Sequence, residues 1–290
     1  MYSNKLYTPL RYPGGKAKFA PFLAKVMEEN DLVGGHYFEP YAGGAGVALE
    51  LLFHEHASHV HINDLDPAVN AFWRSCTENP EELLRLLADT PVNMDEWFRW
   101  RAVLRDEVPA TLVERGFATL FMNRTNRSGI LKGGVIGGKD QSGIYKLDAR
   151  LKKDVLSKRI EKIALHRDQI SVYCEDALTL LKRAGNFLPA QSLTYLDPPY
   201  YVKGRGLYRN FYQHDDHQAI ATLIQATDFK IPWIVSYDAA EQIVEMYKFS
   251  DGFTYGLDYT AQTRYVGSEV MYLSRALVAP GLEFTLPRAA

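Results

Sequence analysis

Short apolar runs alternate with longer amphipathic stretches in the first and last parts of the chain, which predicts strands separated by helices. Strands are expected at residues 36–39, 59–63, 170–174, 192–196, 232–236, 252–256 and 270–274. Helices are expected at residues 17–29, 46–55, 66–75, 176–184, 215–227 and 239–247. This alternation predicts an α/β fold with a doubly wound, mostly parallel sheet of the Rossmann-like type, whose functional site lies at the carboxyl edge of the strands.

The middle of the chain has a different pattern. Residues 78–125 are predicted to be helical, with Trp97, Trp100 and Phe117 as apolar anchors. Six glycines follow between positions 129 and 143, which favours a hairpin or a mobile loop that orders on a partner. We therefore predict a domain of residues 1–74 and 169–290, interrupted by an inserted, mainly helical domain of residues 75–168 with a basic hairpin.

The strand at 192–196 runs directly into Asp197-Pro198-Pro199-Tyr200. An exocyclic amine of adenine or cytosine is a weak nucleophile, and acceptors on its two N–H bonds favour the tetrahedral geometry that attacks a methyl sulfonium. Asp197 is predicted to accept one N–H bond and the Pro198 carbonyl the other. The rings of Pro198 and Pro199 stiffen the turn that carries this carbonyl. Tyr200 offers a face for a base taken out of a duplex. The alternative is an ordinary turn after a strand.

A strand, a glycine-rich turn and a helix are expected over residues 36–55, an arrangement that brings a ligand close to the backbone. Asp64 lies about 20 residues past these glycines, which is the spacing expected for an acid that binds ribose hydroxyls. Leu49 replaces the third glycine of a dinucleotide-binding motif, so we predict a nucleoside site without a pyrophosphate. S-adenosylmethionine fits such a site. The predicted contacts are Glu39, Tyr41, Gly43 and Asp64.

Two further segments carry candidate cofactor contacts. The segment from Arg11 to Lys16 contains Gly-Lys but fails the phosphate-loop spacing, so Lys16 is expected to meet a carboxylate and Tyr12 to lie against the cofactor. A surface turn is the alternative there. Asp176 ends the strand at 170–174 where a helix begins. It either bonds the adenine amino group of the cofactor or caps the helix.

The distribution of charge favours a nucleic-acid partner, although the net charge is only −2. Residues 115–167 hold 13 Lys and Arg against 4 Asp and Glu, a local charge of +9 that leaves −11 on the remainder. A basic insert on an acidic body is typical of a surface that contacts phosphates. A solvated helix face would explain only the part from Lys152 to Lys162.

Within this insert, arginine and asparagine have the shapes that suit guanine and adenine edges in the major groove. The predicted DNA contacts are Arg124, Asn126 and Arg127, with Lys132 and Lys139 nearer the phosphates. The alternative for Arg124 and Asn126 is that they hold the loop together.

These motifs, in this order, resemble the Dam-type DNA adenine-N6 methyltransferases. The resemblance extends from Arg11 to about Leu273. It implies that Tyr12, Lys16, Asp64 and Asp197 line S-adenosylmethionine, and that Asp197 also faces the target amine. Two departures are Tyr12, where some members carry Trp, and Ala45, which replaces the second glycine of the aromatic-x-Gly-x-Gly turn.

We therefore expect a site-specific methyltransferase that acts on a flipped adenine in double-stranded DNA and releases S-adenosylhomocysteine. The alternatives are a cytosine-N4 DNA methyltransferase and a catalytically idle DNA-binding regulator. A protein-glutamine methyltransferase would be expected to carry Asn in place of Asp197 and would not need the basic insert. The aromatic segment after Tyr200, with Lys203, Arg205 and Arg209, is expected to close over the flipped base, and the alternative is that it packs on the sheet.

The remaining expectations concern metals, cellular location and assembly. The histidines at 54, 56, 59 and 61 have no cysteine beside them, and the two cysteines have neither disulfide nor zinc spacing, so no metal is expected. The chain has no membrane-length apolar run, which indicates a cytoplasmic protein of a bacterium or a phage. We expect a monomer. The sequence leaves two alternatives open, a solitary enzyme or one with a cognate restriction endonuclease that acts separately.

Overall fold

The computed structural model describes residues 7–12, 16–202, 212–259 and 265–280. Two compact units are present. The first contains Met1–Leu6, Lys16–Asp64 and Glu175–Ala290, and the second contains Tyr7–Gly15 and Leu65–Cys174. The second unit thus begins earlier than residue 75 and also takes in a segment near the N-terminus. Lys203, Arg205 and Arg209 lie outside the described residues.

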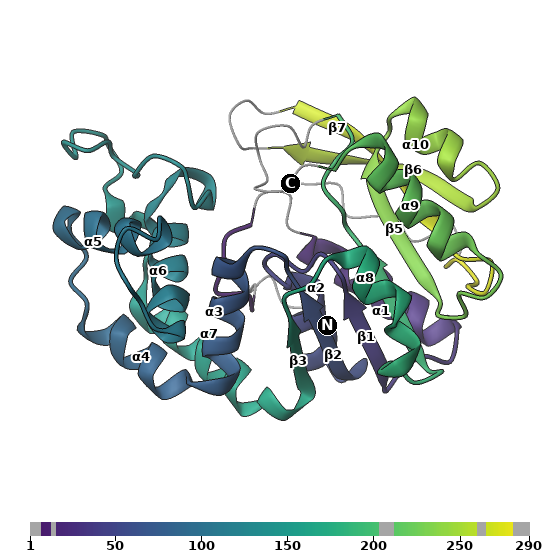
Figure 1. Ribbon diagram of the computed structural model, residues 1–290, viewed down its shortest axis with the longest axis horizontal. Coiled ribbons are helices and arrows are strands. Elements are labelled where there is room, and N and C mark those ends of the chain that lie inside the picture. The colour runs from purple at the N-terminus through teal and green to yellow at the C-terminus, as the bar shows by residue number, and fades with distance from the viewer. Residues whose placement is uncertain (1–6, 13–15, 203–211, 260–264, 281–290) are drawn as a thin grey trace. The chain divides into compact units, whose positions relative to one another are not determined.

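Seven strands form one sheet in the order β3-β2-β1-β4-β5-β7-β6 (Figure 1). The pairs β2–β1, β1–β4 and β4–β5 are parallel, whereas β7 pairs antiparallel with both β5 and β6. The prediction of a doubly wound, mostly parallel α/β sheet is confirmed. The strands are β1 (Gly35–Glu39), β2 (Ala57–Asn63), β3 (Ile170–Tyr173), β4 (Ser192–Leu196), β5 (Trp233–Asp238), β6 (Asp251–Tyr259) and β7 (Tyr265–Leu273).

The core of the first unit forms around its central strands, in which the apolar and the polar side chains alike are buried. Every residue of β4 and β5 is buried. The apolar run from Val47 to Leu52 is likewise buried, as expected for a helix that lies against such strands. The helices of this unit are α1 (Ala20–Glu29), α2 (Gly46–Phe53), α8 (Ala177–Lys182), α9 (His214–Gln225) and α10 (Glu241–Met246), with short 3-10 turns at Ala17–Phe19 and Ala184–Asn186.

Ala45 stands at the N-cap of α2 and has left-handed backbone angles, with φ of 45° and ψ of 35°. A residue with a Cβ atom pays about 1–2 kcal/mol for this conformation, which glycine adopts without that cost. The turn therefore keeps a conformation suited to glycine even where the sequence departs from glycine.

The second unit is built mainly from helices, drawn in blue to teal in Figure 1. Trp97, Trp100 and Phe117 are buried, which confirms them as apolar anchors. A Cβ atom on Gly116 would lie 2.3 Å from the Ser75 hydroxyl oxygen, so glycine permits a close approach of two helices. These helices are α3 (Pro67–Glu78), α4 (Pro80–Asp89), α5 (Met94–Leu104), α6 (Leu112–Thr125) and α7 (Lys153–Leu165), with 3-10 turns at Arg127–Gly129, Leu147–Arg150 and Arg167–Gln169.

No helix among the described residues has both the length and the apolar character that crossing a membrane requires.

Candidate active site

Four acidic residues lie at the carboxyl ends of parallel strands in the first unit. Glu39 ends β1, Asp64 follows β2, Asp197 follows β4 and Asp238 ends β5. Since β2, β1, β4 and β5 are parallel neighbours, these acids share one edge of the sheet. This is the edge at which doubly wound sheets bind ligands.

Asp197 combines a structured environment with access to solvent. Its side chain is 24% exposed, and its Oδ1 atom lies 3.7 Å from the Lys16 ammonium. The Ser236 hydroxyl donates a hydrogen bond of 3.0 Å to the same Oδ1. Burial raises the pKa of Asp197 to about 6, while Lys16 lowers it and Glu269 raises it. The carboxylate is therefore ionised at neutral pH and can accept an N–H bond from a ligand.

Lys16, Tyr200 and Glu269 form a buried cluster beside Asp197. The Lys16 ammonium donates to Glu269 Oε2 at 2.6 Å and to the Tyr200 hydroxyl at 2.7 Å. The Tyr200 hydroxyl in turn donates to Glu269 Oε1. The carboxylate that meets Lys16 is thus supplied by the protein itself. The sequence pattern led us to expect that Lys16 meets a carboxylate.

The turn after Asp197 is held from β5. Pro198 is buried, and Asp238 accepts hydrogen bonds of 2.9 Å from the backbone N–H groups of both Tyr201 and Val202. Our sequence reasoning did not single out Asp238, although it is an acid beside the end of the strand expected at 232–236. The rule that identified the other acids at strand ends would have found it.

The glycine-rich turn after β1 is tied to the end of β2. The Gly43 backbone N–H donates to Asp64 Oδ2 at 3.1 Å, and the Asn63 side chain donates to the Pro40 carbonyl at 2.9 Å. Asp64 is half-buried. Tyr41 is also half-buried, and its hydroxyl donates to the Tyr212 hydroxyl at 3.0 Å. A partly exposed carboxylate beside a glycine backbone suits a ribose diol, so these residues fit a nucleoside.

Glu39 and Asp176 both have structural partners. Glu39 Oε1 accepts from the Ala48 backbone N–H and the Tyr37 hydroxyl, each at 3.1 Å, which ties β1 to α2. Burial raises the pKa of Glu39 to about 8, so this carboxyl group is mostly protonated at neutral pH. Asp176 is exposed and accepts from the Thr179 backbone N–H at 2.9 Å, which is the capping role left open by the sequence.

Tyr12 belongs to the second unit and is half-buried there. The residue before it is anchored by Asn123, whose side chain accepts from the Arg11 backbone N–H at 2.7 Å and donates to the Arg11 carbonyl at 2.8 Å. This two-way pairing makes Asn123 a structural residue that our sequence reasoning missed. Residues 13–15 lie outside the described part of the chain.

Arg124 and Asn126 do not have the exposed side chains expected of base contacts. Asn126 is 0% exposed, accepts from the Trp97 indole N–H at 2.8 Å, and donates to the carbonyls of Ile130 and Leu131 at 3.0 Å. Arg124 is buried and donates to the Pro9 carbonyl. The structure thus corrects these two predictions in favour of the alternative, that both side chains hold the loop together.

The other candidate DNA contacts, Arg127, Lys132 and Lys139, are exposed. Their loop is closed by backbone bonds, with the Arg127 N–H donating to the Gly134 carbonyl at 2.9 Å and the Ile136 N–H to the Thr125 carbonyl at 2.8 Å. The loop therefore presents cations on an ordered backbone.

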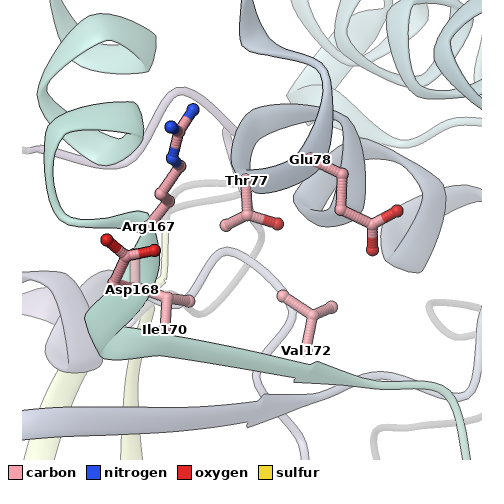
Figure 2. Close-up of a pocket in the computed structure, with 6 residues that line it drawn as sticks. All are labelled: Thr77, Glu78, Arg167, Asp168, Ile170 and Val172. Carbon is pink, nitrogen blue, oxygen red and sulfur yellow. The ribbon is translucent and has the colours of Figure 1, made fainter.

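An open pocket of about 470 Å³ lies in the second unit and contains none of the predicted site residues. Figure 2 shows Arg167, Asp168 and Glu78 around its apolar side chains. Among the described residues, no group of three or more His, Cys, Asp or Glu side chains is arranged to hold a metal ion.

Comparison with known proteins agrees with the geometry. Residues 12–261 match the family model of the D12 class N6 adenine-specific DNA methyltransferases. A curated relative, the Type II methyltransferase M1.LlaDCHI of Lactococcus lactis subsp. cremoris, is 27% identical over 198 residues, which are 66% of this chain and 64% of that relative. The match thus spans slightly less than two thirds of the relative's length. The family match confirms the resemblance that the ordered motifs indicated.

Proposed function

The chain belongs to the D12 class N6 adenine-specific DNA methyltransferase family, and we propose that it methylates the N6 amine of a flipped adenine at a specific site in double-stranded DNA. The methyl donor is S-adenosylmethionine, and S-adenosylhomocysteine is released. The observation that supports this proposal most directly is the environment of Asp197. It is a partly exposed carboxylate that lies beside Lys16 and immediately before the turn from Pro198 to Tyr200. No metal is required by this chemistry.

The cofactor would be held at the glycine-rich turn of the first unit. Asp64 would accept the ribose hydroxyls, while Tyr41 and Gly43 would shape the turn around the nucleoside. Lys16 and Asp197 line the neighbouring edge of the sheet. Further contacts are proposed for Glu39 and Asp176, and for Tyr12 of the second unit. When bound, the cofactor supplies a methyl group on a sulfonium.

The target amine would be activated by position and charge. Ionised Asp197 would accept one N–H bond of the amine and the Pro198 carbonyl would accept the other, which draws the nitrogen toward tetrahedral geometry. The ring of Tyr200 would stack on the base. Because these groups are held before the substrate arrives, they need little rearrangement during the reaction.

The second unit supplies the proposed DNA surface. Arg127, Lys132 and Lys139 are exposed cations on its ordered loop, in a part of the chain whose local charge is +9 over residues 115–167. Neutralising phosphates releases counterions, so this surface favours duplex DNA strongly at low salt. We propose residues 75–168 as the main target-recognition region.

We further propose that the protein acts as a monomer in the cytoplasm. The relative's name assigns that protein to the Type II methyltransferases. On the strength of this likeness we propose that the protein belongs to a restriction-modification system, with a cognate restriction endonuclease that acts separately.

The test is to incubate the protein with unmethylated DNA and methyl-labelled S-adenosylmethionine, digest the DNA to nucleosides, and identify the labelled base. We expect N6-methyladenine with the wild type and none with Asp197→Ala. Label in N4-methylcytosine would instead establish the cytosine-N4 alternative. Cofactor and DNA binding without any label would indicate the idle DNA-binding regulator.

A further inference from the structure

Glu269 is a buried acid that the proposed reaction has not yet required. It is 0% exposed on β7 and lies opposite Asp238 in the antiparallel ladder with β5. Each of its oxygens has a partner, with Oε2 accepting from Lys16 and Oε1 from Tyr200. A carboxylate so deeply buried needs such charged and polar partners, because its desolvation is costly.

The cluster places two carboxylates around one ammonium. Lys16 Nζ lies 2.6 Å from Glu269 Oε2 but 3.7 Å from Asp197 Oδ1. Lys16 therefore makes a direct hydrogen bond to Glu269 and only a longer-range interaction with Asp197. In this asymmetric cluster, Asp197 Oδ1 is hydrogen-bonded to Ser236, while the Lys16 ammonium stays at salt-bridge distance from it, 3.7 Å away.

The asymmetry bears directly on how Asp197 can function. A carboxylate that is paired directly with an ammonium is a weaker acceptor for a neutral amine. Tyr200, in turn, must hold its ring still if a base is to stack on it, and its hydroxyl is fixed by Lys16 and Glu269 together. Glu269 thus influences both residues on which the proposed reaction depends, Asp197 through the position of Lys16 and Tyr200 through a direct hydrogen bond.

We propose that Glu269 is a positioning residue for methyl transfer, which holds Lys16 away from Asp197 and fixes the hydroxyl of Tyr200. This inference rests on the proposed function. Without the charge of Glu269, Asp197 is the other carboxylate within salt-bridge distance of Lys16, and the ammonium would approach Asp197 Oδ1 more closely and compete with the amine for this carboxylate.

Glu269→Gln tests the charge, because glutamine has nearly the same shape. We expect kcat to fall about 100-fold, as for misplaced reacting groups. We also expect the acid limb of kcat against pH to move to lower pH by about one unit. The negative charge of Glu269 raises the pKa of Asp197, and the positive charge of Lys16 lowers it. Losing the charge of Glu269 and bringing Lys16 closer would therefore both lower the pKa of Asp197. The other titratable groups that face Asp197 are Tyr37, Glu39 and Tyr195.

Glu269→Asp keeps the charge but shortens the side chain by one methylene group. We expect kcat to fall about tenfold, with the acid limb close to that of the wild type. Glu50→Gln is the matched control, since Glu50 is another buried glutamate of the first unit and lies 3.4 Å from His54, outside the acidic edge. This control should keep kcat within about twofold, as for sites remote from the chemistry. Thermal unfolding of each variant separates misfolding from misplacement.

A Glu269→Gln enzyme with kcat near the wild-type value would overturn the proposal. So would a folded variant with reduced kcat and an unmoved acid limb, because that result describes a purely structural glutamate. If Glu269→Gln does not fold, Glu269→Asp becomes the test of the proposal. A wild-type kcat in that variant would contradict the positioning role. Failure of the wild type to methylate DNA would instead refute the proposed function.

Discussion

The acidic edge of the first unit and the end of α6 in the second unit are both rich in polar residues, but they use them differently. At the acidic edge, Asp197 interacts with the side chains of Ser236 and Lys16 and stays partly exposed. At the end of α6, Asn123 and Asn126 are buried and bond chiefly to backbone groups. Backbone partners fix the shape of a loop, whereas ionisable side-chain partners leave a group that can still exchange partners with a substrate.

The largest expected effect tests how the turn at the acidic edge is held. Asp238 accepts from two backbone N–H groups, those of Tyr201 and Val202, with both oxygens. Asp238→Asn leaves one of these groups facing an NH₂ donor, which costs about 1–3 kcal/mol where the group is buried. We expect kcat to fall by about 100-fold, because the turn that carries Tyr200 is displaced. Steady-state kinetics check this, with KM for the cofactor changing much less.

Asp251→Asn provides the matched control, because Asp251 is an exposed aspartate at the start of β6. It should leave kcat unchanged. A normal kcat in Asp238→Asn would show that the backbone bonds to this turn are dispensable for catalysis.

The second prediction concerns stability at the end of α6. Asn126→Ala removes the partner of the Trp97 indole and of the Ile130 and Leu131 carbonyls. We expect the free energy of unfolding to fall by about 2–3 kcal/mol, since buried polar groups are left unpaired. Urea denaturation measures this. The neighbouring Arg127→Ala, on an exposed side chain, should change it by less than about 0.5 kcal/mol. Equal losses of unfolding free energy in the two variants would contradict the structural role of Asn126.

Most of the fold followed from the sequence. Apolar strands such as 192–196 have few alternatives, and the helices at 78–125 were expected from their anchors Trp97, Trp100 and Phe117. The acids at strand ends were also predictable, because parallel strands bring their carboxyl ends to one edge. Asp64 and Asp197 were found by that rule, and Asp238 was within its reach.

Other features depended on pairing between distant segments. Glu269 lies in a C-terminal strand, and only the ladder between β5 and β7 brings it next to Lys16 and Tyr200. Its one local signal is a charged residue within an apolar strand. Arg124 and Asn126 had the composition of base contacts, and nothing local shows that their partners include Pro9 and Trp97. Residue type indicates what a side chain can bond, and the fold decides what it does bond.

The smallest expected effect concerns the exposed cations of the second unit. Arg127, Lys132 and Lys139 are exposed, in contrast to buried Arg124, so each is free to meet a phosphate. Replacing any one of them by Ala should weaken DNA binding a few-fold at moderate salt and reduce the slope of log K against log salt by about one unit. Fluorescence anisotropy with a duplex at several salt concentrations measures both. Lys182→Ala, which removes an exposed lysine of α8 in the first unit, is the control and should leave the slope unchanged. The slope of log K against log salt reports the number of phosphate contacts. An unchanged slope in all three variants would therefore show that the ordered loop does not contact the DNA backbone.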